Sequence, residues 1–429
     1  MTTPKRFLFA ITDAGGSVPP DTSVVRALVD RGHDVRVLAD RVLAPDIEPT
    51  GAVHLPWTSA PQRPDLEPTS MVIKDWDART PQQAFVRVLE GVMTRPAALF
   101  AADVRAELRR EPADAVVSNI FLLGAQLAAQ AENVPVAVLI PNLFAIPGWG
   151  IPPIGPGLSP MRGPVGRLRD GVLNRMTVRL FDRGLDELNG ARRANGLPPL
   201  PHVLDQFTEA DRILLLTSRA FEFEQYSPPS MVRFCGPRLD DPAWAGDWTP
   251  PPGDAPLVLV GLSSTFMDHT DHLRRIAAAL GDLPVRGLVT TGPAIDPDRI
   301  DAPANVHVVR SAPHSQVLKH ASAVVTHAGH GTVIKALAAG VPLVCLPLGR
   351  DQLDNAARVA AHGAGLRLKP KAKAPAIAQA VSRVLADPSF ADGARRIGAA
   401  IADDLREDRA VAELEELVCR AATREPAAA

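Results

Sequence analysis

The sequence has few of the residues that build a covalently stapled or metal-bound fold. Only three of its 429 residues are cysteines, Cys235, Cys345 and Cys419, and they stand far apart. An odd, scattered set of this kind gives neither a disulfide framework nor the spacing of a zinc site. A disulfide-rich secreted domain is therefore excluded, and a cytoplasmic, reducing location is expected.

An excess of charge of one sign is also missing. Lys and Arg number 46 against 48 Asp and Glu, which gives a formal charge of −2. Bulk binding of nucleic acid requires a basic surface, so this class is excluded, whereas a small anionic ligand needs only a few local groups. No apolar run has the length of a membrane span. The start, MTTPKRFLFAIT, reads as a strand and not as a secretion signal.

What the sequence does contain is an alternation of strands and helices. Arg6 to Thr12 is a short apolar run typical of a buried strand, a helical pattern follows up to Gly32, and HDVRVLAD is a second strand. Similar units recur over residues 114–141 and again over residues 256–349. Because this chain is too long for one core, we predict an α/β protein with two doubly wound, Rossmann-like domains.

The domain boundary is marked by composition. Residues 236–256 are rich in Pro, Gly and Asp and have no apolar period, so they are predicted to link a domain at 1–235 to a domain at 257–429. The last helices can cross back to the first domain. A second irregular stretch, residues 141–164, carries Phe144 and Trp149. These rings either line a pocket for an apolar ligand or cover the domain core.

The stretch THAGHGT, Thr326 to Thr332, lies where a predicted strand turns into a helix. Amide groups at a helix N-terminus bind phosphate well, and Gly329 and Gly331 allow a close approach to the backbone. His327 and Thr332 can each donate a further hydrogen bond. Asp351 and Gln352, at the end of the next predicted strand, have the chemistry to bind sugar hydroxyls. This combination favours a nucleotide-diphosphate sugar as the ligand.

These residues resemble the signature region of family 1 glycosyltransferases, which have the two-domain GT-B fold. The elements of the family pattern occur in order: His327, Gly329, Gly331, Thr332, Gly340-Val341-Pro342, Pro347, Asp351-Gln352, Asn355-Ala356 and Arg358-Val359. The first βαβ unit also looks like that of the family. The nearest likeness is to actinobacterial enzymes that glycosylate antibiotics and other natural products.

The resemblance implies roles for individual residues. The N-terminal domain would hold the acceptor, and the C-terminal domain would hold the donor without a metal ion or other cofactor. The implied donor-binding residues are Ser263, Ser264, Ser311, His314, His327, Gly329, His330, Gly331, Thr332, Asp351 and Gln352. Ser311, His314 and Lys335 depart from the residues common in plant members, so the nucleotide stays open between TDP and UDP.

The expected catalytic base is absent. The family usually has His in a G-H-x-x-P pattern, with an Asp partner at the end of a later strand, whereas here Ser17 and Asn119 stand at those places. Asp13, on the strand before Ser17, is the nearest carboxylate. Our hypothesis is that Asp13 takes the acceptor proton with Ser17 positioning it, and that Asn119 borders the acceptor. The alternative is that Asp13 only caps the loop amides.

We therefore predict an inverting hexosyltransferase that moves a sugar from a TDP- or UDP-sugar to a hydroxyl of a hydrophobic natural product, such as a polyketide or phenolic antibiotic. Two alternatives stay open. One is an auxiliary or inactive sugar-nucleotide-binding protein, which the missing dyad would permit. The other is a nucleotide-sugar epimerase of the same fold. A dehydrogenase is disfavoured because DAGGSVPP is not a GxGxxG turn. No feature of the sequence indicates an oligomeric state.

Overall fold

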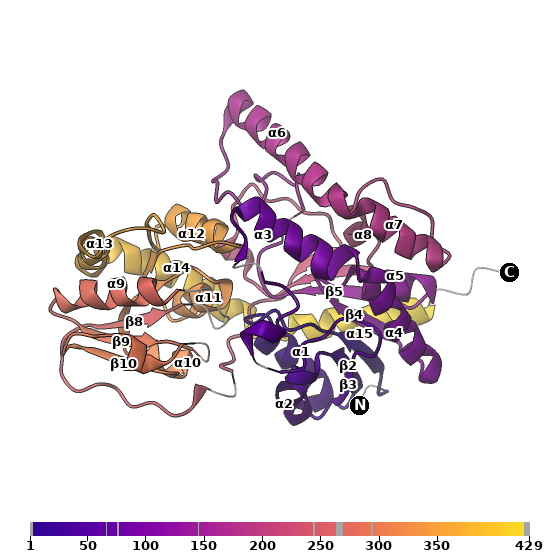
Figure 1. Ribbon diagram of the computed structural model, residues 1–429, viewed down its shortest axis with the longest axis horizontal. Helices are drawn as coiled ribbons and strands as arrows, with labels where there is room; N and C mark the ends of the chain where they lie inside the picture. Colours follow the sequence, from indigo (N-terminus) through magenta and orange to yellow (C-terminus); the bar gives the residue numbers. More distant parts are fainter. Residues whose placement is uncertain are drawn as a thin grey trace.

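The protein is organised around two parallel β-sheets. The computed structural model describes residues 3–65, 67–74, 77–144, 146–242, 245–262, 269–292 and 295–423. Figure 1 shows the two sheets side by side, each with helices on both faces. The prediction of two doubly wound α/β domains is confirmed.

The first sheet has seven strands, all parallel, in the order β3-β2-β1-β4-β5-β6-β7. Its central strands β1, β4 and β5 are mostly apolar and buried, as expected for a sheet covered on both faces. The strands are β1 (Arg6–Ala10), β2 (Asp34–Ala39), β3 (Val53–Pro56), β4 (Ala115–Asn119), β5 (Val136–Ile140), β6 (Arg212–Leu215) and β7 (Val232–Phe234).

The helices of this half connect and cover those strands. They are α1 (Val18–Asp30), α2 (Ala44–Ile47), α3 (Pro81–Val88), α4 (Ala97–Arg110), α5 (Leu123–Ala131), α6 (Gly163–Phe181), α7 (Leu185–Ala194) and α8 (Asp205–Thr208). A π-helical segment, Leu89–Thr94, follows α3. Helix α6 extends away from the rest of the domain (Figure 1).

The second sheet has six parallel strands in the order β10-β9-β8-β11-β12-β13. The strands are β8 (Leu257–Gly261), β9 (Arg286–Thr290), β10 (Val306–Val309), β11 (Ala321–Thr326), β12 (Leu343–Cys345) and β13 (Gly365–Arg367). The helices are α9 (Thr270–Gly281), α10 (His314–Val317), α11 (His330–Ala338), α12 (Gln352–Ala361), α13 (Ala374–Ala386), α14 (Pro388–Asp404) and α15 (Arg409–Thr423).

Helix α15 packs on the first sheet although it follows the second one in the chain. Its apolar side chains, Val411 and Leu414 among them, are buried in one cluster with Val24 and Leu28 of α1. Glu415 of the same helix pairs with Arg31 and with the ring of His33, at 2.8 and 3.0 Å. The C-terminal helix therefore ties the two halves of the chain together.

A second connection lies between helix α12 and the irregular stretch before α6. Asp354 accepts hydrogen bonds from the backbone N–H groups of Gly155 and Gly157, at 2.7 and 3.1 Å. Arg358, one turn later, forms a buried ion pair with Glu222 at 2.6 Å. The stretch 146–162 is thus anchored to the second domain by main-chain groups.

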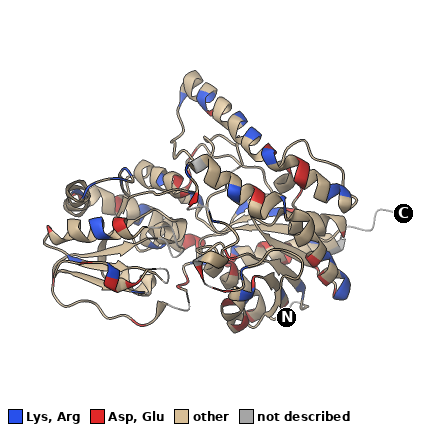
Figure 2. Cartoon of the chain, viewed as in Figure 1, with Lys and Arg blue, Asp and Glu red and all other residues tan. Residues whose placement is uncertain are grey.

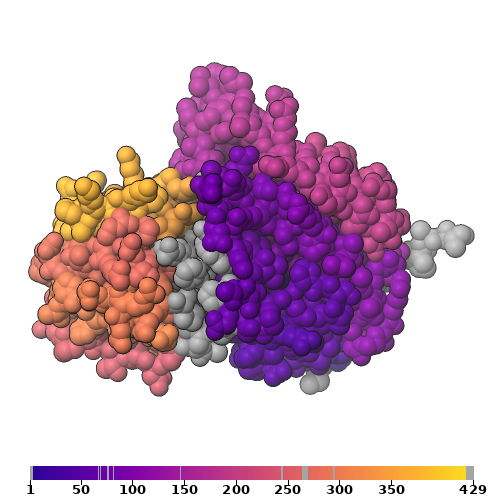
Figure 3. All heavy atoms as spheres, viewed as in Figure 1, coloured from indigo at the N-terminus to yellow at the C-terminus, as the bar shows by residue number. Residues whose placement is uncertain are grey.

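Basic and acidic residues are mixed along the chain. Figure 2 shows Lys and Arg positions interspersed with Asp and Glu positions in both domains, and Figure 3 shows the two domains as adjoining lobes. In the described part of the chain, no helix is both long and apolar enough to span a membrane.

Candidate functional site

Each sheet has one place where the connections reverse direction. In the first sheet it lies between β1 and β4, and in the second between β8 and β11. In open α/β sheets, ligands bind outside the carboxyl ends of the strands at this reversal. Most of the residues singled out in the sequence follow β1, β4, β8 or β11 directly. The fold thus brings them to the two places where a ligand is expected.

The loop after β11 has the geometry of a phosphate site. Strand β11 ends at Thr326, and α11 begins at His330 after a three-residue turn. The first amides of a helix have no acceptor within the helix, and they carry the positive end of the helix dipole. Gly331 is exposed, and a Cβ built on it would meet nothing within 4 Å. A diphosphate oxygen can therefore approach these amides closely.

His327 lies beside this helix start and is neutral at physiological pH. Burial is the main reason that its pKa falls to about 3; electrostatic interactions with His269 and Arg350 lower the pKa further, and a hydrogen bond with the backbone of Gly261 opposes them. A neutral imidazole contributes an N–H donor and not a cation. Arg350 itself is exposed and held at a φ of 56°. Neither His269 nor Arg350 was assigned to the site from the sequence.

The ring of His327, as it lies in the structure, leaves no room for a side chain at Gly329. A Cβ built at Gly329 would lie 2.6 Å from His327 Nε2 and 2.7 Å from Cε1. Its φ of −60° is ordinary, so the restriction is steric and not conformational. The residue between them, Ala328, has a φ of 69°, which is uncommon for a residue with a side chain.

The second histidine of the motif is turned into the protein. His330 is 5% exposed, and its Nδ1 lies 3.2 Å from Asn355 Oδ1. Burial is the first cause of its lowered pKa. Asn355 also donates to the carbonyl oxygen of Ala328 and to Asp351 Oδ2. Donor binding by the His330 side chain stays a prediction, whereas its backbone N–H belongs to the first turn of α11.

Asp351 and Gln352 begin helix α12 at the edge of the second sheet. The side-chain oxygen of Gln352 accepts the backbone N–H groups of Leu348 and Gly349, at 2.7 and 3.0 Å. Gln352 is 2% exposed, and Asp351 is half-buried. The loop that carries both residues is therefore fixed before any ligand arrives. Their contact with sugar hydroxyls stays a prediction.

The residues expected near the nucleotide base lie around β8 and β9. His314 is hydrogen-bonded to Thr290 Oγ1 at 3.2 Å, and burial lowers its pKa to about 4. Its Cε1 lies 2.8 Å from the place of a Cβ on Gly261, the last residue of β8. Ser311 is half-buried just before α10. Ser263 and Ser264, which were expected near the diphosphate, lie outside the described residues.

Lys335 joins α11 to the segment between the domains. Its ammonium donates to the carbonyl oxygen of Asp240 and to Asp241 Oδ1, both at 2.7 Å. Burial alone would raise the pKa of Asp241, but Lys335 and hydrogen bonds from Ser315 outweigh it and leave this pKa lowered. The position that often holds Glu in plant members is thus used here to hold the interdomain segment.

In the first domain, both oxygens of Asp13 have partners. Oδ1 accepts the backbone N–H of Gly15 at 3.1 Å, and Oδ2 forms an ion pair with Arg63 at 2.6 Å. The side chains of Asp13 and Arg63 are both 10% exposed. The hypothesis that Asp13 takes the acceptor proton stays a prediction, and it requires the carboxylate to exchange one of these partners.

Ser17 and Asn119 lie at the same edge of the sheet, with an unexpected third residue. Ser17 precedes α1 directly and is 9% exposed. The side-chain amide of Asn119, the last residue of β4, donates to Asp21 Oδ2 at 2.8 Å. Asp21 is fully buried in the first turn of α1, and sequence reasoning missed it. Its only sequence signal was an acidic residue on an otherwise apolar helix start.

The aromatic residues of the irregular stretch are packed together. Phe144 is 2% exposed and meets Phe207 edge-on, with ring centroids 5.9 Å apart. Trp149 is half-buried between Phe144 and Tyr226, at 5.5 and 6.2 Å. These rings contribute to the core of the first domain. A contact with the acceptor stays a prediction for both.

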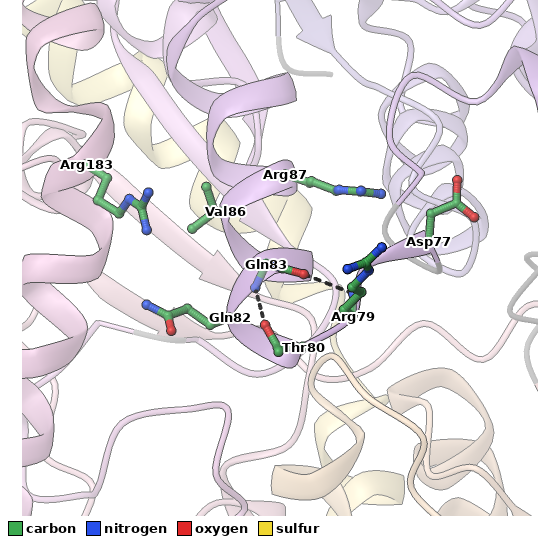
Figure 4. A pocket seen from close by; sticks show the side chains of 8 residues that line it. All are labelled: Asp77, Arg79, Thr80, Gln82, Gln83, Val86, Arg87 and Arg183. Carbon is green, nitrogen blue, oxygen red and sulfur yellow. Dashed lines mark hydrogen bonds between the residues drawn. The ribbon is translucent and has the colours of Figure 1, made fainter.

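A cavity at the start of helix α3 has a volume of about 730 Å³. Figure 4 shows its lining: Asp77, Arg79, Thr80, Gln82, Gln83, Val86, Arg87 and Arg183. The loop that forms it is held by two hydrogen bonds, from Arg79 N to Gln83 Oε1 and from Gln83 N to Thr80 Oγ1. In the described part of the chain, no group of three or more His, Cys, Asp or Glu residues could hold a metal ion.

Comparisons with known proteins agree with the donor loop. Residues 201–418 match the family described as UDP-glucoronosyl and UDP-glucosyl transferase. The chain is 32% identical to 4'-demethylrebeccamycin synthase of Lentzea aerocolonigenes over 91% of its length and 94% of that protein. It is 28% identical to oleandomycin glycosyltransferase of Streptomyces antibioticus over 99% of its length and 94% of that protein. The calicheamicin glycosyltransferase CalG4 superposes with a TM-score of 0.76 at 24% identity, over 98% of this chain and 99% of that one.

Proposed function

The chain belongs to the UDP-glucoronosyl and UDP-glucosyl transferase family, and we propose that it moves one sugar from a TDP- or UDP-sugar to a hydroxyl group of a hydrophobic natural product. The observation that carries this proposal is the arrangement of His327 and Gly329 at the N-terminus of α11. It provides donors for a diphosphate without a metal ion.

The donor would be bound by the second domain in three parts. The diphosphate would accept from the first amides of α11 and from the neutral ring of His327. The sugar would lie towards Asp351 and Gln352, and the base towards Ser311 and His314. As the bond from the anomeric carbon to the diphosphate breaks, negative charge develops on the leaving oxygen. Donors already aimed at that oxygen stabilise the transition state most strongly.

The acceptor would be bound by the first domain, at the carboxyl ends of β1 and β4. The hydroxyl attacks the anomeric carbon from the side opposite to the diphosphate, so the configuration at that carbon inverts. Two of the relatives are a demethylrebeccamycin synthase and an oleandomycin glycosyltransferase. Their names support a large, mostly apolar acceptor.

We propose that the reaction takes place in the cytoplasm. The three cysteines are free, and two of them, Cys235 and Cys345, are buried. Burial raises the pKa of both thiols to about 12, so they act as small core residues and not as nucleophiles.

The experiment is product detection by mass spectrometry. The protein is incubated with mixed TDP- and UDP-sugars and a panel of polycyclic phenols, macrolides and ansamycins. A gain of one hexose or deoxyhexose on an acceptor is the expected result. Binding of a sugar nucleotide with no acceptor modified across the panel would support an auxiliary protein instead. An altered sugar nucleotide formed without any acceptor would support an epimerase.

A further inference from the structure

A buried carboxyl group lies at the reversal point of the first sheet, where the acceptor is expected. Asp21 is in the first turn of α1, directly after β1, and its side chain is inaccessible to solvent. It is joined to the neighbouring strand by the hydrogen bond from Asn119 Nδ2 to Asp21 Oδ2, at 2.8 Å. The two residues are 98 positions apart in the sequence. Burying a carboxyl group is unfavourable, so this arrangement requires an explanation.

The orientation of Asn119 is fixed by a second hydrogen bond. Its Oδ1 accepts the backbone N–H of Phe121 at 3.1 Å. Because a backbone N–H can only donate, the amide nitrogen must be the atom that faces Asp21. An aspartate at position 119 would instead place a second carboxyl group against the first. Strand β4 therefore supplies the hydrogen-bond donor, Asn119, and helix α1 supplies the carboxyl group, Asp21.

Two polar side-chain atoms at this place have no hydrogen-bond partner in the described part of the chain. Among the described residues, neither Asp21 Oδ1 nor Ser17 Oγ makes a hydrogen bond, and both are buried. Ser17 and Asp21 are four residues apart, and the backbone N–H of Asp21 donates to the carbonyl oxygen of Ser17 at 3.2 Å. Residues at this spacing lie on the same face of a helix. Native proteins rarely leave such atoms unsatisfied unless a ligand or a functional step uses them.

The space next to Ser17 is open on one side. The preceding residue, Gly16, is exposed, and a Cβ built on it would meet nothing within 4 Å. Ser17 thus stands between an accessible position and the enclosed Asp21. Ser17 Oγ is itself buried in the structure, so an acceptor hydroxyl reaches it only if the side chain of Ser17 turns towards the open side at Gly16, whereas Asp21 stays enclosed.

The pKa of Asp21 is shifted by burial and not by charged neighbours. Burial raises the pKa of Asp21 to about 8, and the hydrogen bond from Asn119 reduces this effect. The charged groups on the surrounding elements are engaged with one another: Asp13 with Arg63, Glu415 with Arg31 and His33, and Glu413 with Arg212 and Arg233. A proton acceptor is most effective when its pKa is close to the working pH.

We propose that Ser17 and Asp21 form a proton relay for the transfer reaction, in which Ser17 contacts the acceptor hydroxyl and Asp21 is the final proton acceptor, oriented by Asn119. This inference rests on the proposed function and assigns the step that the missing His/Asp dyad leaves without a residue. Ser17 is the catalytic residue of the relay, and Asp21 acts through it.

The step is balanced in atoms and charge. The acceptor oxygen forms a bond to the anomeric carbon, and the bond from that carbon to the diphosphate breaks, with its electron pair leaving on the diphosphate. Ser17 Oγ and Asp21 Oδ1 are not hydrogen-bonded to each other in the structure, so the step requires the Ser17 hydroxyl to turn towards Asp21. The acceptor proton then passes to Ser17 Oγ as the hydroxyl proton of Ser17 passes to Asp21 Oδ1. Asp21 becomes a neutral carboxylic acid and loses its proton to solvent after the product has left.

Asp13 and Asp21 are distinguishable by their surroundings. Both oxygens of Asp13 are bonded, to Gly15 and to Arg63. Asp21 has one bonded oxygen and one without a partner among the described residues. Asp21 Oδ1 can therefore take up a proton without giving up an existing hydrogen bond or ion pair, and it has no cationic partner that favours the charged form as Arg63 does for Asp13.

The experiment is the pH profile of kcat/KM between pH 5.5 and 9.5 with an alcohol acceptor that the enzyme glycosylates. Because the relay needs ionised Asp21, the wild-type rate should rise with pH and level off above about pH 8. Asp21→Asn and Ser17→Ala should each lower kcat by roughly 10²–10⁴-fold and abolish this rise. The KM for the sugar nucleotide should stay within about twofold. The loss should be smaller with a phenol acceptor, which gives up its proton more readily.

Two further variants separate the relay from a structural role. Asp103→Asn is the matched control, because Asp103 is a buried carboxylate of the same domain whose oxygens are bonded to Thr58, Ser59 and Ala60. Its pH profile should match the wild type. Asn119→Asp keeps Asp21 but adds a second carboxyl group at hydrogen-bond distance. The rise should then move to higher pH, since two carboxyl groups that close resist ionising together.

The outcomes are distinct. If the wild type transfers sugar but Asp21→Asn keeps its kcat and its pH profile, the relay is wrong and the proposed function stands. If Asp21→Asn does not fold, an unchanged pH profile in Asn119→Asp overturns the relay instead. A loss confined to Asp13→Asn would return the base to Asp13. A wild type that transfers no sugar overturns the proposed function itself.

Discussion

The side chain of Asn355 is hydrogen-bonded to the ring of His330, with Asn355 Oδ1 3.2 Å from His330 Nδ1. The orientation of this amide follows from its other contacts. Its nitrogen donates to the carbonyl oxygen of Ala328 and to the carboxylate of Asp351, which can only accept. His330 Nδ1 must therefore carry a proton and donate it to Asn355. One amide thus fixes the donor loop, the start of α11 and the start of α12.

The first prediction concerns this contact. Asn355→Ala removes three hydrogen bonds, so the donor loop should lose its fixed shape. We expect the KM for the sugar nucleotide to rise by about 10–100-fold and the free energy of unfolding to fall by about 1–3 kcal/mol. Steady-state kinetics and urea unfolding measure the two effects.

The matched control is Asn305→Ala. Asn305 also donates to three backbone carbonyl oxygens, those of Leu280, Leu283 and Val285. It directly precedes β10, however, and so lies at the amino end of that strand, away from the donor loop. That variant should lose stability without a change in donor KM. Equal KM values in the two variants would contradict the role given to Asn355.

The second prediction concerns His327. His327→Ala removes an N–H donor from the diphosphate site, and a loss of about 10²-fold in kcat/KM is expected. Because its pKa is about 3, the ring is neutral from pH 6 to pH 8 and the loss should be the same at both. His307→Ala is the control, since His307 is an exposed residue of β10. A loss that grew steeply towards low pH would show that the charged ring acts instead.

The third prediction uses the steric contact between Gly329 and His327. Gly329→Ala places a methyl group 2.6 Å from His327 Nε2, so the ring must move. Donor binding should weaken by about tenfold or more, measured by calorimetry with TDP and UDP. Gly190→Ala on α7 is the control, because a Cβ there meets nothing within 4 Å. Helix propensity predicts a gain of roughly 0.5–1 kcal/mol in stability for Gly190→Ala with donor affinity unchanged.

The fourth prediction links Asp21 to stability. In the folded chain its pKa is raised to about 8 from an ordinary value of 3.8, so the folded state retains a proton that the unfolded state loses between these pH values. The contribution of Asp21 to the stability of the wild type should therefore fall as pH rises from about 4 and level off near 8. Asp21→Asn removes this dependence, and its free energy of unfolding should exceed that of the wild type by about 1–3 kcal/mol at pH 7.5.

Urea unfolding at pH 5, 6.5 and 8 measures this difference. The gain should grow with pH across the three points. A variant that is less stable than the wild type at every pH, with an unchanged slope, would show that Asp21 is not held as a buried acid. A variant that is more stable but inactive would be difficult to explain by a structural role alone.

The parts of the fold that were predicted from the sequence are those that adjacent residues determine. Strands such as β1, β8 and β11 are short apolar runs that end in glycine or a polar turn, and both features can be read from adjacent residues. The loop from His327 to Thr332 was predicted for the same reason. Its chemistry is carried by consecutive residues whose spacing does not depend on the rest of the chain.

The parts that were missed depend on distant contacts. Strand β3 is a half-exposed edge strand with the sequence VHLP, so it has no apolar run to mark it. Asp21 is marked only by burial and by Asn119, which comes from another strand. The inward turn of His330 likewise depends on Asn355, 25 residues later. A sequence shows which groups are present but not which of them the sheet brings together.

The central claim is the transfer of a sugar, and the most direct measurement is the stoichiometry of a single reaction. With one acceptor identified, released nucleoside diphosphate and new glycoside are quantified together in the wild type and in His327→Ala. We expect one glycoside for each nucleoside diphosphate released, and we expect both to fall about 10²-fold in the variant. Nucleoside diphosphate released without glycoside, or a glycoside yield unchanged in His327→Ala, would contradict it.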